Sequence, residues 1–214
     1  MKNHNTRHKI GNIISTHILN NLKEYISVVL VFLIGVILGV IIINHSSENQ
    51  IIQIKEYINN FINDLKEYGN IDKSSLLTQT LLNNAYLILA LWLAGSTVIG
   101  IPIVYGIVAY KGFCLSYTIS SSIITLGTLK GILFSMSSML LQNLIYIPCI
   151  WALAVSGIKL YKSIVKDKRR ENIKLEIVRH IMFSLIIGIV IILAGTFIET
   201  YVSTSLILAV SNSL

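Results

Sequence analysis

Four polar residues that lie in or beside long apolar runs have the clearest capacity for chemistry. Glu199 follows the apolar run 181–198, and Asn84, Gln142 and Asn143 belong to other runs. In a membrane, a carboxylate at mid-depth marks a proton or cation pathway, whereas amides hydrogen-bond between helices. Because run 181–198 is itself long enough to cross most of a bilayer, we expect Glu199 near the outer surface. A structural pairing or a partner contact is then its expected role.

No enzyme motif accompanies these residues. The sequence lacks a P-loop, HExxH, GxSxG and an EF-hand loop. Its five histidines have no metal-binding spacing and are expected at membrane interfaces, and Cys114 and Cys149 lie in apolar runs without a CxxC motif. We therefore predict a non-enzymatic protein with no catalytic residue, no metal site and no cofactor.

The composition identifies the environment. Of the 214 residues, 54% are hydrophobic and 13% are charged, whereas soluble domains carry about 25% charged residues. That balance excludes a soluble enzyme and also excludes a disordered chain, which needs low hydrophobicity and high charge. The remaining class is a polytopic membrane protein.

Hydropathy divides the chain into spans. We predict an all-α integral membrane helix bundle that forms a single domain over 1–214. Its transmembrane helices, about five in number, are expected at 26–43, 84–109, 113–129, 133–155 and 181–198. The second and third spans are divided at 110–112, and a sixth span is the main rival. Pro102 predicts a kink or break in the second span, and Pro148 lies in the fourth. The tail 200–214 is expected to re-enter the membrane or lie on it.

Basic residues predict the orientation. They concentrate in an amino-terminal segment, 1–25, with helical apolar spacing, and in the loop 159–180. By the positive-inside rule both are cytoplasmic, and segment 1–25 is expected to lie on the membrane as an amphipathic helix. Loop 159–180 has Tyr161 as its one aromatic residue, so nucleic acid is not an expected partner. The first apolar run, 26–43, is interpreted as a signal-anchor helix that stays in the protein.

The segment 44–80 is the one sizeable polar stretch between spans. It carries three lysines against five acidic residues, which places it outside the cell. From Ile51 to Tyr68 its apolar residues recur every three or four positions, which predicts an external amphipathic helix. Packing on the membrane surface, covering the spans and docking an extracellular partner are three open roles. In the first span, Gly35 and Gly39 form a small-xxx-small pattern that permits close helix approach.

Three short blocks resemble a known family. Asn83-Asn84 opens a run punctuated by Gly95, Gly100, Gly106 and Gly112, and Gln142-Asn143-Leu144 leads to Pro148. The third block runs from Ala194 through Glu199 to Ser203. Together with the chain length and the five spans, these blocks resemble the stage II sporulation protein M family, although Thr204 stands where that family often has proline.

The resemblance implies a function. It implies a non-catalytic scaffold of endospore formation that anchors two peptidoglycan-degrading partners, stage II sporulation proteins D and P, at the septal membrane during forespore engulfment. Its other expected partners are the lipid bilayer and, as an open alternative, a second copy of the chain. The rival hypothesis is a small transporter or channel with a path lined by Gln142, Asn143, the serine-rich third span and Glu199. A weaker option is a permease subunit that couples to a cytoplasmic ATPase through loop 159–180. Scarce charge within the spans favours the scaffold.

Overall fold

A computed structural model describes residues 15–68, 72–97, 99–166 and 170–211. The described chain is helical and contains no strand. Its elements follow in chain order: α2 (Leu22–Asn44), α3 (Glu48–Tyr68), α4 (Lys73–Gly95), α5 (Ile101–Leu126), α6 (Thr128–Ser135), the π-helical η1 (Met136–Leu140), α7 (Leu141–Lys166), α8 (Arg170–Val190), η2 (Ile191–Gly195), η3 (Ile198–Ser203) and α9 (Thr204–Ser211). The predicted all-α bundle is confirmed, whereas most of the predicted segment 1–25 lies outside the described residues.

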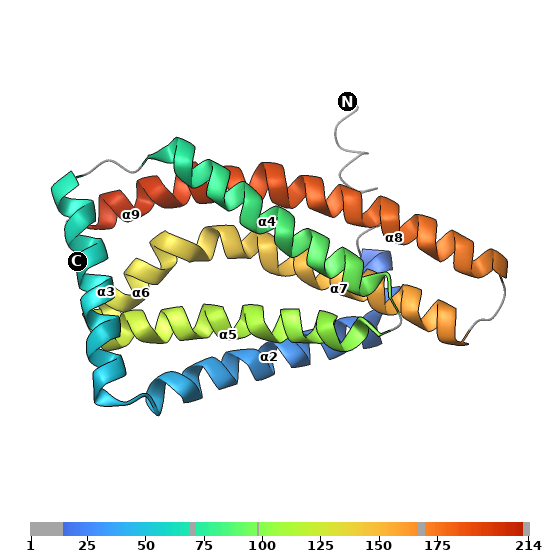
Figure 1. The fold of residues 1–214 in the computed structure, drawn as a ribbon, viewed down its shortest axis with the longest axis horizontal. Coiled ribbons are helices and arrows are strands. Elements are labelled where there is room, and N and C mark those ends of the chain that lie inside the picture. Colours follow the sequence, from blue (N-terminus) through green and yellow to red (C-terminus); the bar gives the residue numbers. More distant parts are fainter. Residues whose placement is uncertain (1–14, 69–71, 98, 167–169, 212–214) are drawn as a thin grey trace.

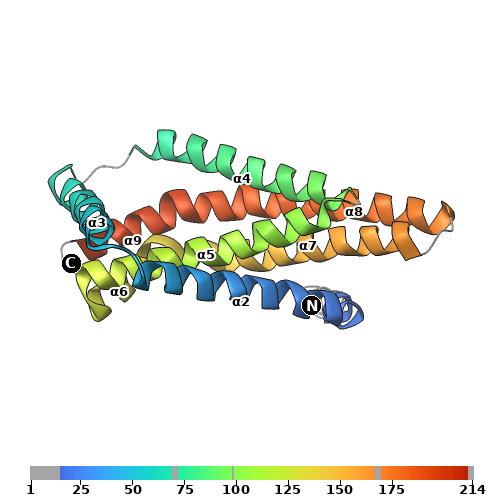
Figure 2. The ribbon, with the colours of Figure 1, turned by 60° about the horizontal axis from the view of Figure 1, so that its bottom comes forward.

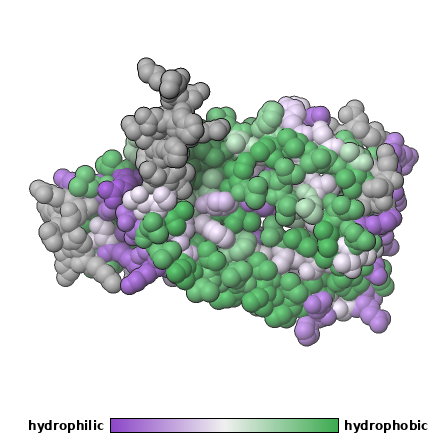
Figure 3. Space-filling view, turned by 180° about the vertical axis from the view of Figure 1, so that it is seen from behind, coloured by the Kyte–Doolittle hydropathy of each residue, from purple (hydrophilic) through white to green (hydrophobic). Residues whose placement is uncertain are grey.

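Five stretches are long and apolar enough to cross a membrane. They are Leu22–Asn44, Lys73–Gly95, Ile101–Leu126, Thr128–Val165 and Ile173–Ser211. Figure 1 shows them side by side along the long axis of the molecule. From behind, a broad apolar band covers the flank of the bundle, and polar residues gather towards its ends (Figure 3). Exposed apolar side chains on that flank are expected where lipid replaces water as the solvent.

The predicted division between the second and third spans is wrong. The chain leaves α4 at Gly95 and enters α5 at Ile101, and α5 runs without interruption through Lys111. The helix is broken just before Pro102, as one of the two predicted outcomes required, and Pro102 itself lies in the first turn of α5. The first turn suits proline because an amide hydrogen there has no helical acceptor to lose. Pro148 does lie inside α7.

The predicted ending of the fifth span is also wrong. The helix continues past Ile198 through η3 and α9 to Ser211, so most of the tail belongs to the span. The six residues of η3 are π-helical, a wider turn that sequence periodicity does not anticipate. The apolar residues 206–210 of the tail lie in the last turns of this helix.

Glycines bring α2 and α5 together. A Cβ atom at Gly35 would collide with the carbonyl oxygen of Ala109, and one at Gly112 would collide with the carbonyl oxygen of Phe32. Gly39 lies against Ser116 and Phe113 in the same way. The small-xxx-small pattern of the first span therefore serves close backbone packing, and its partner is α5.

Helix α3 lies across one end of the bundle (Figures 1 and 2). Its buried residues Ile58, Ile62 and Leu65 form an apolar cluster with Phe134 and Ile207. The predicted amphipathic helix is thus present, and its apolar face covers the ends of the spans. The segment after it is shorter than predicted, because α4 already begins at Lys73.

Candidate functional site: a polar cluster inside the bundle

Six polar residues meet between the spans and are called here the polar cluster: Asn84, Gln142, Tyr146, Thr196, Glu199 and Ser203. Asn84 comes from α4, Gln142 and Tyr146 come from α7, and the others come from the last span. The Asn84 amide nitrogen donates to the Tyr146 hydroxyl at 2.7 Å and to the Thr196 hydroxyl at 3.3 Å. Three helices are therefore joined by side-chain hydrogen bonds.

Glu199 is joined to this network through Tyr146. The Tyr146 hydroxyl donates to Glu199 Oε2 at 2.7 Å. One turn further on, the Ser203 hydroxyl donates to the side-chain oxygen of Gln142 at 2.6 Å. In an apolar surrounding, each of these bonds satisfies a group whose burial without a partner would be costly.

Local sequence makes room for the cluster. Gly195 lies directly against the Tyr146 ring, and a Cβ atom at this position would overlap ring atom Cε1. The last span is also π-helical on both sides of Thr196, over Ile191–Gly195 and over Ile198–Ser203. A π-helical turn shifts the following side chains around the helix axis. The glycine and the wide turns together set the positions of Thr196, Glu199 and Ser203.

A cavity of about 210 Å³ adjoins the cluster. Its lining includes Asn84, Gln142, Asn143 and Glu199, and it also includes Lys111 from α5. Lys111 and Glu199 are the two charged residues of this lining, and they have opposite signs. Their attraction is stronger here than in water because the local dielectric is lower. The site can hold a polar solute or water, and it can also serve as structural glue between helices.

Glu199 lies within the last span and not just beyond its end. The helix runs on from Glu199 to Ser211, which corresponds to about 18 Å at the helical rise of about 1.5 Å per residue. Lys111 lies well inside α5, although it was predicted to divide two spans. The bundle therefore does contain ionisable residues within its spans, and such residues mark functional or structural polar sites.

The other predicted site residues separate into two groups. Asn143 lines the cavity, although its amide nitrogen donates within its own helix, to the carbonyl oxygen of Met139 at 2.8 Å. Pro102 and Pro148 do not line this cavity. Sequence reasoning missed Lys111, Tyr146, Thr196 and Ser203, because hydropathy had assigned Lys111 to a loop and the others resemble ordinary span residues.

A second buried polar pair lies nearer the other end of the bundle. His180 is 2% exposed, and its Nδ1 atom lies 2.9 Å from the Ser156 hydroxyl. This histidine of α8 is buried inside the bundle, against Ser156 of α7 and Gly95 of α4. Its neighbour Gly95 approaches Gly157 closely, which lets α4 and α7 cross there. Among the described residues, no group of three His, Cys, Asp or Glu side chains could hold a metal ion.

The family comparison decides the identity. The family model described as stage II sporulation protein M matches residues 28–204. The chain belongs to the stage II sporulation protein M family. The match extends from α2 to the first residue of α9, so every residue of the polar cluster lies within the family's shared region. Comparisons with curated proteins and with solved structures gave no match.

Membership in the stage II sporulation protein M family supports a role in sporulation. With five membrane-spanning helices, the chain is a multi-pass membrane protein of that process. In this chain, the hydrogen bonds of the polar cluster join α4, α7 and the last span.

Proposed function

We propose that this protein is a non-catalytic membrane scaffold of endospore formation. It would anchor the peptidoglycan-degrading stage II sporulation proteins D and P at the septal membrane during forespore engulfment. The partners would supply the wall-cutting chemistry. The bundle would supply a fixed position in the membrane and a surface outside it.

The observation that carries this proposal is the packing of α3. Ile58, Ile62 and Leu65 seat one face of the helix on Phe134 and Ile207. The opposite face is exposed and polar, and it is called here the outer face of α3: Gln53, Glu56, Asn60, Asn63 and Glu67. A helix fixed on a membrane bundle with a free polar face suits protein docking, because little conformational entropy is lost when a partner binds.

Charge supports the orientation that this function requires. The end of α7 and the start of α8, which carry basic residues such as Lys162 and Lys174, lie at the end of the bundle opposite α3 (Figure 1). Lys162 and Glu24 form an ion pair between α7 and α2 at that basic end. The positive-inside rule assigns the basic end to the cytoplasm and α3 to the outside, where the cell wall lies.

A pull-down from sporulating cells tests the proposal. A tagged chain, crosslinked in the membrane before extraction, should co-purify both partners. An unrelated polytopic membrane protein with the same tag is the control and should recover neither. Absence of both partners from the crosslinked sample would refute the scaffold function.

The cavity supports one rival function, a small transporter or channel. Lys111, Glu199, Gln142 and Asn84 provide charged and polar groups within the spans, as a solute path requires. Substitution Glu199→Gln should then change a flux measured in proteoliposomes, whereas Glu67→Gln on the outer face of α3 should not. No flux in the wild-type protein under any imposed ion gradient would count against transport.

A further inference from the structure

A large cavity opens at the basic end of the bundle, and it is called here the interfacial cavity. Its volume is about 930 Å³, within the range of small-molecule sites. Three parts of the chain form its walls: residues 17–30 around the start of α2, the middle of α7 and residues 176–187 of α8. The walls are mainly apolar, with Ile26, Leu30, Ala152 and Ile186 among them.

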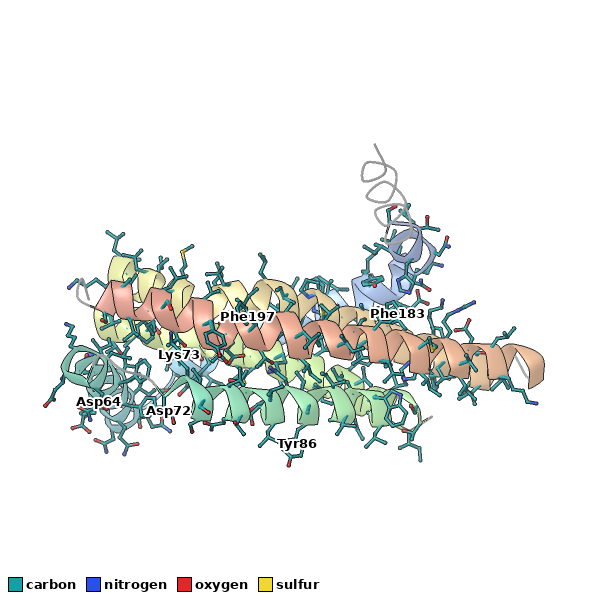
Figure 4. All side chains as sticks on the ribbon, turned by 90° about the horizontal axis from the view of Figure 1, so that it is seen from above. Asp64, Asp72, Lys73, Tyr86, Phe183 and Phe197 are labelled. Atoms are coloured by element: carbon teal, nitrogen blue, oxygen red, sulfur yellow. The ribbon has the colours of Figure 1, made fainter. Side chains whose placement is uncertain are left out.

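Aromatic packing holds His17, near the start of the described chain, in place beside this cavity. The rings of His17 and Phe183 stack with centroids 5.0 Å apart and planes 20° apart. The Tyr25 hydroxyl lies 3.3 Å from His17 Nδ1. Figure 4 shows Phe183 on α8 where that helix passes the start of the described chain. The first wall is therefore attached to α8 by specific contacts.

The rim of the interfacial cavity is positively charged. Lys159 and Arg179 line it together with Glu176 and His17. Glu176 forms an ion pair with Arg179, so the rim keeps one net positive charge with His17 neutral. Burial, followed by Lys159 and Arg179, lowers the pKa of His17 below its usual value. A bound anion would offset the positive charge that Lys159 and Arg179 give to this rim.

The dimensions of the cavity match one leaflet of a bilayer. Along α7 its lining extends from Pro148 to Lys159, which corresponds to about 16 Å at the helical rise of about 1.5 Å per residue. One leaflet contributes about half of the ~30 Å hydrocarbon core. The basic rim would then lie at the headgroup level of the cytoplasmic leaflet, with the apolar walls at the depth of the acyl chains.

We propose that the interfacial cavity binds one anionic phospholipid, with its phosphate against Lys159 and Arg179 and its acyl chains along α2, α7 and α8. Basic pockets between helices on the cytoplasmic side select anionic headgroups because they supply local positive charge beside an apolar groove. The charge selects the headgroup, and the apolar walls distinguish a lipid from a free phosphate. The inference is independent of the scaffold's partners.

Fluorescence provides a direct test because Trp151 lines the interfacial cavity and Trp92 does not. The variant Trp92→Phe, reconstituted in phosphatidylcholine vesicles, leaves Trp151 as its one tryptophan. Phosphatidylglycerol with brominated acyl chains should quench Trp151 at a mole fraction about fivefold lower than brominated phosphatidylcholine does, because a basic residue near the membrane surface contributes about that factor. In Trp92→Phe/Lys159→Gln/Arg179→Gln the two lipids should quench alike.

Matched controls make the result decisive. The pair Lys55→Gln/Lys66→Gln removes the same charge from α3 at the opposite end and should keep the phosphatidylglycerol preference. Soluble glycerol phosphate should not reduce that preference, since it lacks acyl chains. The single variant Lys159→Gln serves if the double variant does not fold, and it should lower the preference.

Four outcomes would overturn the proposal. Equal quenching by both lipids would identify ordinary boundary lipid. No quenching by either lipid would mean that the chain itself fills the cavity. A preference that survives loss of Lys159 and Arg179 would place the headgroup elsewhere, and competition by glycerol phosphate would identify a simple phosphate site.

Discussion

Tyr146 donates a hydrogen bond to Glu199 across the interior of the bundle, with a distance of 2.7 Å between the hydroxyl oxygen and Oε2. The bond joins α7 to the last span, and Asn84 extends it to α4 through its own bond to the Tyr146 hydroxyl. Sequence separations of 53 and 62 residues are closed by these two bonds. Tyr146 is therefore the residue through which the three helices are joined.

Removing the Tyr146 hydroxyl tests that role. Substitution Tyr146→Phe leaves both the Asn84 amide and the Glu199 carboxyl without this partner. We expect the free energy of unfolding to fall by about 1–2 kcal/mol, since a bond to a carboxylate exceeds the membrane-protein average. Reversible unfolding in mixed detergent micelles measures the change.

Tyr86 on α4 provides the matched control. It is 68% exposed and points away from the bundle (Figure 4). Tyr86→Phe removes the same atom and should leave the free energy of unfolding within about 0.5 kcal/mol of the wild type. If both variants lowered the free energy of unfolding equally, the Tyr146 hydrogen bonds would not stabilise the bundle more than an exposed hydroxyl does.

Gly195 should tolerate no side chain. In Gly195→Ala the new methyl group overlaps the Tyr146 ring, so the ring must move and its bond to Glu199 must lengthen. We expect a loss of about 1–3 kcal/mol, the usual cost of overpacking. Gly106→Ala in α5 is the control, because no heavy atom lies within 4 Å of its added Cβ. A Gly195→Ala protein as stable as Gly106→Ala would contradict the packing described for the cluster.

Helix α3 should detach when its buried face becomes polar. Ile62 is 4% exposed, whereas Ile52 on the same helix is 55% exposed. Ile62→Asn loses apolar burial and places an amide against Phe134 and Ile207, at a cost of at least about 2 kcal/mol. Amide hydrogen exchange of residues 48–68 should accelerate about 30-fold. Ile52→Asn should leave exchange unchanged, and acceleration in both variants would mean that α3 is not held by this face.

Much of the fold could be predicted from the sequence, and the limits have a physical cause. Apolar runs of sufficient length predict the number of spans, and the apolar repeat from Ile51 to Tyr68 predicts α3, because both signals are local. The ends of the spans were less predictable. Lys111 resembles a loop residue by hydropathy, yet α5 contains it, because Glu199 and the neighbouring polar groups give it a favourable position inside the bundle.

The polar cluster was predicted in part. Asn84, Gln142, Asn143 and Glu199 stood out as polar residues in apolar runs, and all four line one cavity. Tyr146 did not stand out, because tyrosine is common in membrane helices and its role depends on contacts distant in sequence. The position of Glu199 inside the last span was missed for a related reason, since the helix continues beyond Ile198 through π-helical turns that leave no signal in hydropathy.

The most direct test of the scaffold function concerns the outer face of α3. Glu56→Ala/Asn60→Ala/Glu67→Ala removes three exposed polar side chains from that face and introduces a good helix former. Lys23→Ala/Lys174→Ala, at the basic end, is the control. The measurement is the binding of purified external domains of stage II sporulation proteins D and P to the chain in lipid nanodiscs.

We predict that the wild type and the control variant bind at least one partner and that the α3 variant binds it at least about fivefold more weakly, as expected when contact residues of an interface are removed. The α3 variant should unfold at the same temperature as the wild type, which separates lost docking from lost structure. Binding to neither partner by the wild type, or equal binding by the wild type and the α3 variant, would contradict docking on the outer face of α3.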